Sequence, residues 1–185
     1  MESSQAIQVP EKEDIHINNQ LYQVHILDLK AIIAHIRNPT QFTDSLQDAI
    51  RQHRNNPKFQ LHDLITEWVH AIPEPETLFF IVTDKKSPQV LSTARLLYYP
   101  KYRSGQINMV WTSPTHRNKK LCQHNLRNIV SKTQHKITRY ILDVDVDNHA
   151  AIKACSNVGF INKTEYYNKA ATCYTMELTS SVSCV

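Results

Sequence analysis

The chain has 185 residues, of which 41% are hydrophobic and 21% charged, a balance that is typical of a folded globular protein and excludes a largely disordered one. The formal net charge of +4 does not by itself indicate a nucleic-acid-binding protein, and it favours anionic ligands only where basic residues are concentrated. With only two glycines, the chain has no glycine-rich phosphate loop of the usual form. We expect a single domain.

The N-terminal third of the chain predicts a strand followed by a block of helices. Residues 1–18 are polar and show no periodicity, so we expect a flexible segment there, before a domain that spans residues 19–178. Residues 21–26 alternate as in a strand. Apolar residues then recur at helical spacing in three stretches, each ending near asparagine or proline, at residues 29–36, 42–50 and 61–72.

The remainder of the chain predicts a sheet with two more helices. Three apolar runs separated by short turns indicate an antiparallel meander, at residues 78–82, 90–99 and 107–112. We then expect a helix at residues 122–130, a strand at 140–146 and a second helix at 148–159, which Gly159 ends. Two last strands are expected at residues 166–167 and 173–178, followed by a polar tail at 179–185. The predicted fold class is α/β (α+β), with a mixed, mainly antiparallel sheet of about six to seven strands flanked by helices.

Residues 107–130 combine a strand, a basic turn and the start of a helix. The turn contains Arg117, Lys119 and Lys120. The first N–H groups of a helix have no intrahelical partner and lie at the positive end of the helix dipole, so several donors can hold an anion placed beside them. We therefore predict that this turn binds phosphate. The basic run is short and lacks interleaved aromatic residues, so we do not expect nucleic acid as a partner.

Two motifs in the second half of the chain resemble the GNAT superfamily of acyl-CoA-dependent N-acyltransferases. The cofactor loop of that family reads Arg/Gln-x-x-Gly-x-Gly/Ala after a proline, and the same frame is found here as Pro114-x-x-Arg117-x-x-Lys120-x-Cys122. The family's next strand and helix contain Asn-x-x-Ala and end in Gly-Phe, and residues 142–160 match this spacing. The resemblance covers roughly residues 20–178.

The resemblance implies that acetyl-CoA, or another acyl-CoA, is a co-substrate. In such folds the strand before the loop separates from its parallel neighbour, and the gap is expected to be lined by Val110, Trp111 and Thr112. The pyrophosphate is expected to contact the backbone amides of Arg117, Asn118, Lys119, Lys120, Leu121 and Cys122. Asn148 matches an asparagine near the pantetheine arm, and Ala151 belongs to the same motif.

Three positions depart from the family pattern. Lys120 replaces a glycine: if the loop keeps its shape, Lys119 and Lys120 add cationic donors, and if it does not, affinity for the cofactor falls. Cys122 replaces a small residue and is expected to be tolerated. Cys155 lies where many members have the tyrosine that protonates the leaving thiolate; it is a candidate acid, and its alternative role is packing.

The candidate general bases are Asp143 and Asp145. An acceptor ammonium must lose a proton before it attacks a thioester, and both aspartates project from the strand beside the expected acyl position. The alternative interpretation is a solvated strand face. Asp147 or Asn148 is expected to cap the helix that follows.

The predicted function is acetyl (acyl) transfer from the CoA thioester to a primary amine by direct attack in a ternary complex, with a small molecule or a protein as the acceptor. The alternative is a GNAT-derived binding or regulatory module with weak or no activity, which Lys120 and Cys155 favour. The histidines and the scattered cysteines show no metal-ligand spacing, so we expect no metal.

The N-terminus predicts no export signal of the usual kind. It is polar and acidic, and no stretch of the chain is long and apolar enough to predict a membrane span. We expect a cytoplasmic monomer or homodimer, although delivery by a specialised secretion system is compatible with the same residues.

Overall fold

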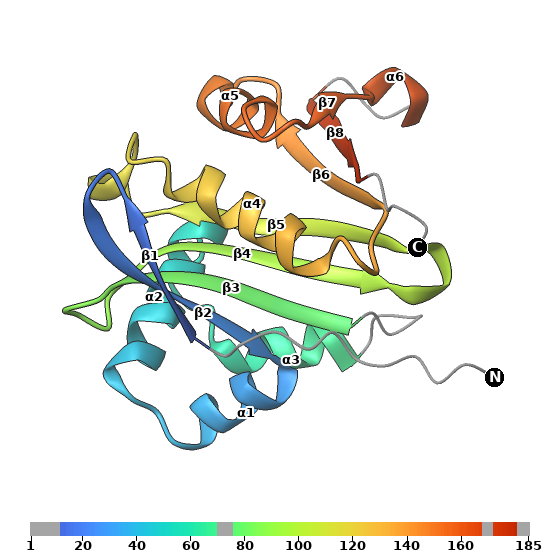
Figure 1. Cartoon of the computed structure of the whole chain (residues 1–185). Helices are drawn as coiled ribbons and strands as arrows, with labels where there is room; N and C mark the ends of the chain where they lie inside the picture. The colour runs from blue at the N-terminus through green and yellow to red at the C-terminus, as the bar shows by residue number, and fades with distance from the viewer. Residues whose placement is uncertain (1–11, 70–75, 168–171, 181–185) are drawn as a thin grey trace.

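The computed structural model describes residues 12–69, 76–167 and 172–180. These residues form one eight-stranded sheet with helices on both faces (Figure 1). The strand order is β1-β2-β3-β4-β5-β6-β8-β7, and every neighbouring pair is antiparallel except β5 and β6, which are parallel. The predicted fold class is confirmed, with slightly more strands than expected. No helix among the described residues is long and apolar enough to cross a membrane.

The strands follow the apolar runs of the sequence. Their bounds are β1 Lys12–Ile17, β2 Gln20–Asp28, β3 Glu76–Asp84, β4 Val90–Tyr99, β5 Ser104–Thr112, β6 Arg139–Asp145, β7 Ile161–Asn162 and β8 Cys173–Thr179. The first five strands form a meander in which each is antiparallel to the next. The chain then crosses through a helix to β6, so the one parallel pair is a strand, helix, strand crossover.

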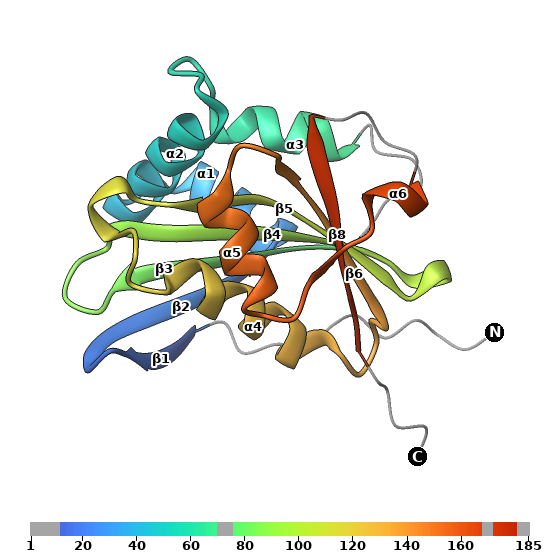
Figure 2. The same ribbon diagram turned by 90° about the horizontal axis from the view of Figure 1, so that it is seen from above.

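The helices divide between the two faces of the sheet (Figure 2). Their bounds are α1 Leu29–Arg37, α2 Gln41–Arg54, α3 Leu61–Val69, α4 Leu121–Thr133, α5 His149–Ser156 and α6 Thr164–Tyr167, with short 3₁₀ turns η1 Pro100–Tyr102 and η2 Pro114–His116. One apolar cluster packs α1, α2 and the start of α3 against β2–β5, and the other packs α4 and α5 against the opposite face. The side chains of Asp28 and Thr40 cap α1 and α2.

Two expectations for the sheet edges are corrected. Residues 12–17 form β1, where we expected a flexible segment, because Ile15 and Ile17 alternate with polar residues and are buried against the sheet; residues 1–11 lie outside the described part of the chain. Residues 166–167 lie in α6 and not in a strand. The Oδ1 atom of Asn162 accepts hydrogen bonds from the backbone N–H and the hydroxyl of Thr164, which turns the chain into a helix directly after β7.

Candidate active site

The parallel strands β5 and β6 are paired at one end only. Their pairing consists of Ser104 with Arg139, Gly105 with Tyr140, and Gln106 with Ile141. Both strands continue beyond these pairs, to Thr112 and Asp145, but in the described part of the chain no further residues of the two strands pair. The sheet therefore opens into a gap at the C-terminal ends of β5 and β6, as the resemblance predicts.

A β-bulge in β5 begins at Met109, a short distance along the strand from the last of these pairs, at Gln106. Thr93 of β4 pairs with Trp111 and Arg95 pairs with Asn108, so two residues of β5, Met109 and Val110, oppose a single residue of β4. Met109 has a positive φ of 51°. A bulge bends its strand and increases its twist, which explains why β5 turns away from β6 at this point.

Two hydroxyl groups of β4 hold the irregular backbone of β5. The Thr93 hydroxyl donates to the Met109 carbonyl at 2.9 Å, and the Ser92 hydroxyl donates to the Trp111 carbonyl at 2.8 Å. Neither Ser92 nor Thr93 was predicted from the sequence as part of the site. The only available signal was the presence of two adjacent polar residues within an apolar strand, which by itself does not locate a bulge.

The three residues expected to line the gap lie at the end of β5 and are partly buried. Val110 packs against the cluster that contains α4 and α5, whereas Trp111 packs against the cluster of α1–α3. The hydroxyl of Thr112 lies within hydrogen-bond distance of the Ser92 hydroxyl, at 3.3 Å. The end of β5 therefore contributes side chains to both faces of the sheet.

The basic turn adopts an irregular backbone with left-handed residues. Asn118 and Lys120 have φ values of 63° and 64°, although neither is glycine. Asparagine tolerates this region well, while a lysine there is strained. The loop thus has, at Lys120, a backbone conformation that favours glycine, with a lysine side chain present.

Helix α4 starts immediately after this turn, with Lys120 as its N-cap and no side-chain cap. A lysine side chain has no hydrogen-bond acceptor, so it cannot occupy the first N–H groups of the helix. Arg117 and Lys120 are exposed, Lys119 is half-buried, and the buried Leu121 anchors the helix start in the core. The positive end of the helix dipole, free backbone donors and cationic side chains therefore lie together at this turn, an arrangement that favours an anion.

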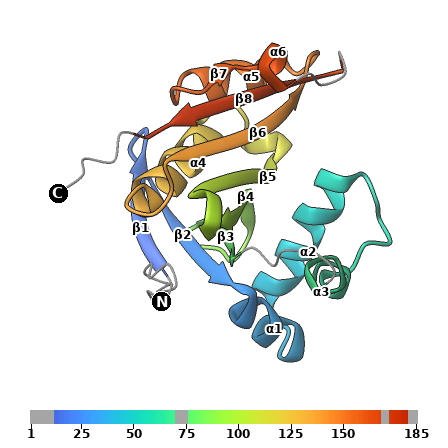
Figure 3. The ribbon, with the colours of Figure 1, turned by 90° about the vertical axis from the view of Figure 1, so that its right-hand side faces the viewer.

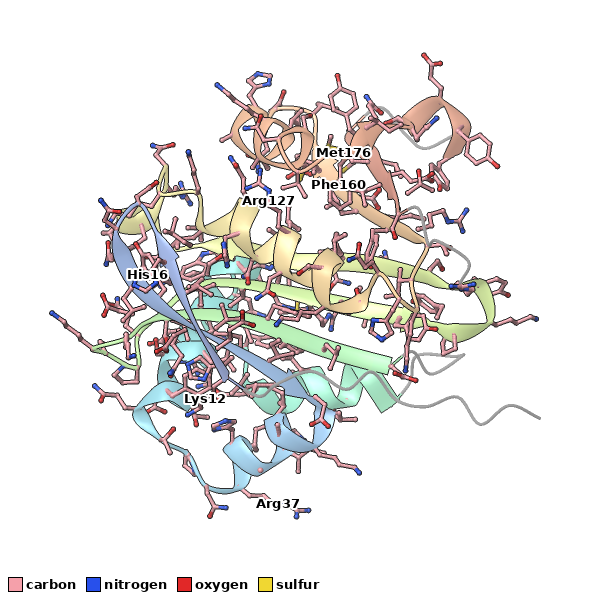
Figure 4. All side chains as sticks on the ribbon, in the orientation of Figure 1. Lys12, His16, Arg37, Arg127, Phe160 and Met176 are labelled. Atoms are coloured by element: carbon pink, nitrogen blue, oxygen red, sulfur yellow. The ribbon has the colours of Figure 1, made fainter. Side chains whose placement is uncertain are left out.

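Asn148 begins α5 on the other side of the gap. Its Oδ1 atom accepts a hydrogen bond from the backbone N–H of Ala151 at 3.1 Å, so Asn148, rather than Asp147, is the helix cap. Arg127 of α4 donates to the carbonyl of Asn157 at 2.9 Å and joins the two helices. Figure 4 shows Arg127 below α5, near Phe160 and Met176.

Asp143 and Asp145 are exposed on the face of β6 that is opposite to α4 and α5. Leu142 and Val144 alternate with them and are buried in the cluster of those helices. The Thr175 hydroxyl donates to Asp143 at 2.7 Å, and the Cys173 thiol donates to Asp145 at 3.3 Å. Figure 3 shows β6 and β8 beside α5, away from α2 and α3. The two aspartates therefore lie on an accessible face at the gap.

The sequence model described as the acetyltransferase (GNAT) family matches residues 41–160. The chain belongs to the GNAT acetyltransferase family. A comparison with curated proteins by sequence gives no match.

Solved GNAT structures share this fold at low sequence identity. The GNAT domain of S. lividans PAT superimposes with a TM-score of 0.69 at 12% identity, covering 94% of this chain and 100% of that one. Ribosomal-protein-S5-alanine acetyltransferase from Vibrio fischeri has a TM-score of 0.60 at 14% identity, covering 91% and 97%. Spermidine N-acetyltransferase from Vibrio cholerae, in complex with CoA and spermine, has a TM-score of 0.58 at 13% identity, covering 85% and 96%. At these identities the likeness supports the shared fold only.

Cys155, which the sequence resemblance places at the acid position of the family, is a core residue of this chain. Its side chain is 3% exposed, and burial, with a smaller contribution from Cys122, raises the pKa of its thiol to about 12. Burial likewise raises the pKa of Cys122 to about 11. A thiol that holds its proton so strongly is a poor donor to a CoA thiolate, whose conjugate acid is an ordinary thiol. The structure therefore favours packing over acid catalysis for Cys155.

The described residues contain no group of three or more His, Cys, Asp or Glu side chains that could hold a metal ion.

Proposed function

We propose that this GNAT protein transfers an acetyl group from acetyl-CoA to a primary amine. The observation that carries the proposal is the gap between β5 and β6, whose open end on β5 leads through the basic turn into the uncapped start of α4. A long anionic thioester requires both features: a slot for its arm and a cluster of donors for its phosphates.

The residues of this chain that would hold the co-substrate lie on both sides of the gap. The amides of Arg117 to Cys122 and the side chains of Arg117, Lys119 and Lys120 supply donors and positive charge for the pyrophosphate. The ends of β5 and α5 supply Val110, Trp111, Thr112, Asn148 and Ala151 for the arm. Acetyl-CoA supplies the acyl group as an activated thioester.

The acceptor is an amine that approaches from the face of Asp143 and Asp145. A carboxylate on this face attracts the ammonium form, removes one proton from it directly or through water, and returns that proton to solvent. The nitrogen then forms the new C–N bond as the C–S bond breaks, and its second proton passes to the leaving CoA thiolate, directly or through water, so that an amide, CoA thiol and the one proton released to solvent are the products. Both aspartates are exposed, which allows the proton to leave.

A second candidate function is a GNAT-derived module that binds an acyl-CoA with little or no transfer. The buried Cys155, at the acid position of the family, favours it. The two candidates share the cofactor site and differ in turnover.

Calorimetric titration with acetyl-CoA tests the shared part of both candidates. We expect binding by the wild-type protein and its loss in Arg117→Glu, which places a negative charge against the pyrophosphate. The matched control is Arg37→Glu, because Arg37 is an arginine at the end of α1, remote from α4 (Figure 4). Absence of binding at millimolar acetyl-CoA, or equal binding by Arg117→Glu and the wild type, contradicts the site assignment.

Release of free CoA thiol in the presence of a panel of amines then separates the candidates. An enzyme releases thiol in proportion to amide formed, whereas a binding module shows saturable binding without release.

A further inference from the structure

We infer that Thr175 is a positioning residue that orients Asp143, and that Asp143 rather than Asp145 takes the proton of the acceptor amine. The inference rests on the proposed function. The two candidate carboxylates differ in the residue of β8 that pairs with each: Thr175 pairs with Asp143, and Cys173 pairs with Asp145.

Asp143 and Thr175 face each other directly in the antiparallel pair of β6 and β8. Both backbone groups of Thr175 point away from β6: its N–H donates to the Thr164 hydroxyl at 2.9 Å, and its carbonyl accepts from the Lys163 N–H at 2.8 Å. Asp143 and Thr175 are therefore a pair without mutual backbone hydrogen bonds, the arrangement that brings opposite side chains closest. The resulting bond between the Thr175 hydroxyl and Asp143 Oδ1 measures 2.7 Å.

Thr175 is itself fixed by the turn before α6. Thr164 accepts from the Thr175 N–H, and its own hydroxyl donates to Asn162 Oδ1 at 2.6 Å. The donors run in one direction, from Thr175 to Thr164 and from Thr164 to Asn162, while the Thr175 hydroxyl remains directed at Asp143. The Thr175 side chain is 0% exposed, so water does not compete for its hydroxyl.

Asp145 has a weaker partner at the equivalent position. Cys173 lies directly across from it, and the thiol donates at 3.3 Å. A thiol is a weak donor, whereas a hydroxyl that donates to a carboxylate forms a short charge-assisted bond. The bond to Asp145 accordingly raises the pKa of the Cys173 thiol, and nearby Asp143 adds to this effect. Asp143 is therefore the more firmly oriented of the two carboxylates.

The position of Asp143 along β6 also favours it as the general base. Ile141 is the last residue of β6 that pairs with β5, and Asp143 is the next residue on the same face. It is thus the first carboxylate of β6 beyond the point where the gap opens. A carboxylate whose rotation is fixed before the acceptor arrives does not lose that freedom during the reaction, and small errors in its placement reduce the rate strongly.

The test compares variants of Thr175 in steady-state acetyl transfer to an amine that the wild-type protein accepts. Thr175→Val keeps the size and removes the donor; we expect kcat to fall about ten- to a hundredfold, while the Kd for acetyl-CoA stays within about twofold. Thr175→Ser restores a hydroxyl and is expected to recover most of kcat. Asp143→Asn is expected to lower kcat at least as much as Thr175→Val, and Asp145→Asn to lower it less.

The matched control is Thr133→Val. Thr133 is also a buried threonine whose hydroxyl donates at 2.7 Å, to the Ile129 carbonyl at the far end of α4. It is expected to lose stability without loss of kcat. If Thr175→Val fails to fold, Thr164→Val, which loosens Thr175 but leaves its hydroxyl, is expected to lower kcat several-fold.

Wild-type kcat in a folded Thr175→Val protein, or in Thr164→Val where Thr175→Val does not fold, overturns the inference and leaves the proposed function intact. A larger loss in Asp145→Asn than in Asp143→Asn does the same. A wild-type protein that binds acetyl-CoA but transfers no acetyl group overturns both the inference and the proposed transfer.

Discussion

The two ends of the β5–β6 pair differ sharply, although the same two strands form both. At the paired end, Gly105 lies so close to its neighbours that an added Cβ would be 2.7 Å from Leu96 Cδ1 and 3.3 Å from Ile137 Cδ1. At the open end, beyond Gln106 and Ile141, the strands separate and the carboxylates of β6 are exposed. Tight packing around Gly105 holds the two strands together at the paired end, so the strands can remain separated at the open end while the sheet stays folded.

The largest effect is expected from filling the closed end. Gly105→Ala forces the buried side chains of Leu96 and Ile137 to move, and overpacking of this kind costs about 1–3 kcal/mol of the free energy of unfolding. Urea denaturation measures the loss, and Gln106→Ala, the adjacent exposed position, is the control. Unchanged stability in Gly105→Ala would show that the closed end is not tightly packed.

A second prediction concerns the continuously paired strands of the meander. Here His25 of β2 stacks on Phe42 of α2, with ring centroids 4.8 Å apart. Burial, with smaller effects of Lys12 and His35, lowers the pKa of His25 to about 4. As the pH falls below about 6.5, the unfolded chain therefore takes up a proton that the folded chain does not. Stability is lost by up to about 1.4 kcal/mol per pH unit down to about pH 4.

The measurement for His25 is denaturation at pH 7 and pH 5.5. We expect the wild-type protein to lose about 1 kcal/mol more than His25→Gln over this interval, since the substitution removes this one proton uptake and leaves the other histidines in place. Equal losses in the two proteins would refute the assignment to His25.

The smallest effect is expected at the open end, from Lys120. Lys120→Gly removes the strain of a left-handed lysine but gives the unfolded chain more freedom, so stability should change by less than about 1 kcal/mol. The loss of one cation is expected to weaken acetyl-CoA binding several-fold, and equally in Lys120→Ala. Calorimetry decides: tighter binding by Lys120→Gly than by the wild-type protein would mean that the lysine obstructs the loop.

Local patterns predicted most of the fold because the relevant contacts are close in sequence. The helical spacing of residues 42–50 and the Gly159 turn need no knowledge of distant residues, and the structure has α2 and a φ of 112° at Gly159 in these places. Strand β1 was missed because its alternation is short and set among charges. The strand expected at residues 166–167 was wrong because Asn162 starts a turn that the aromatic pair obscures.

The site was less accessible to the same approach because its parts meet only after folding. The sequence analysis named Asp143 but not Thr175, since their contact depends on the register of two strands 32 residues apart. The left-handed conformation of Asn118 is usual for asparagine, whereas that of Lys120 is indicated only by the resemblance, which has glycine at this position, and not by the lysine itself. Periodicity identifies which residues are buried; it does not say which residues face one another.

The short pairing of β5 with β6 also affects how the protein opens. Three residue pairs are the only backbone ladder between the N-terminal meander and the unit of β6, β7 and β8 in the described chain. The other links include side-chain packing, the bond from the Thr138 N–H to the Arg103 carbonyl, the bonds of the Tyr140 hydroxyl to α4, and the bond from Arg127 to Asn157. Such a seam is where a native protein separates into cooperative units at a free energy below that of global unfolding. Backbone amides of β6 and β8 should then exchange with deuterated solvent sooner than those of β3 and β4, and a ligand that spans the gap should slow this exchange by joining the two units.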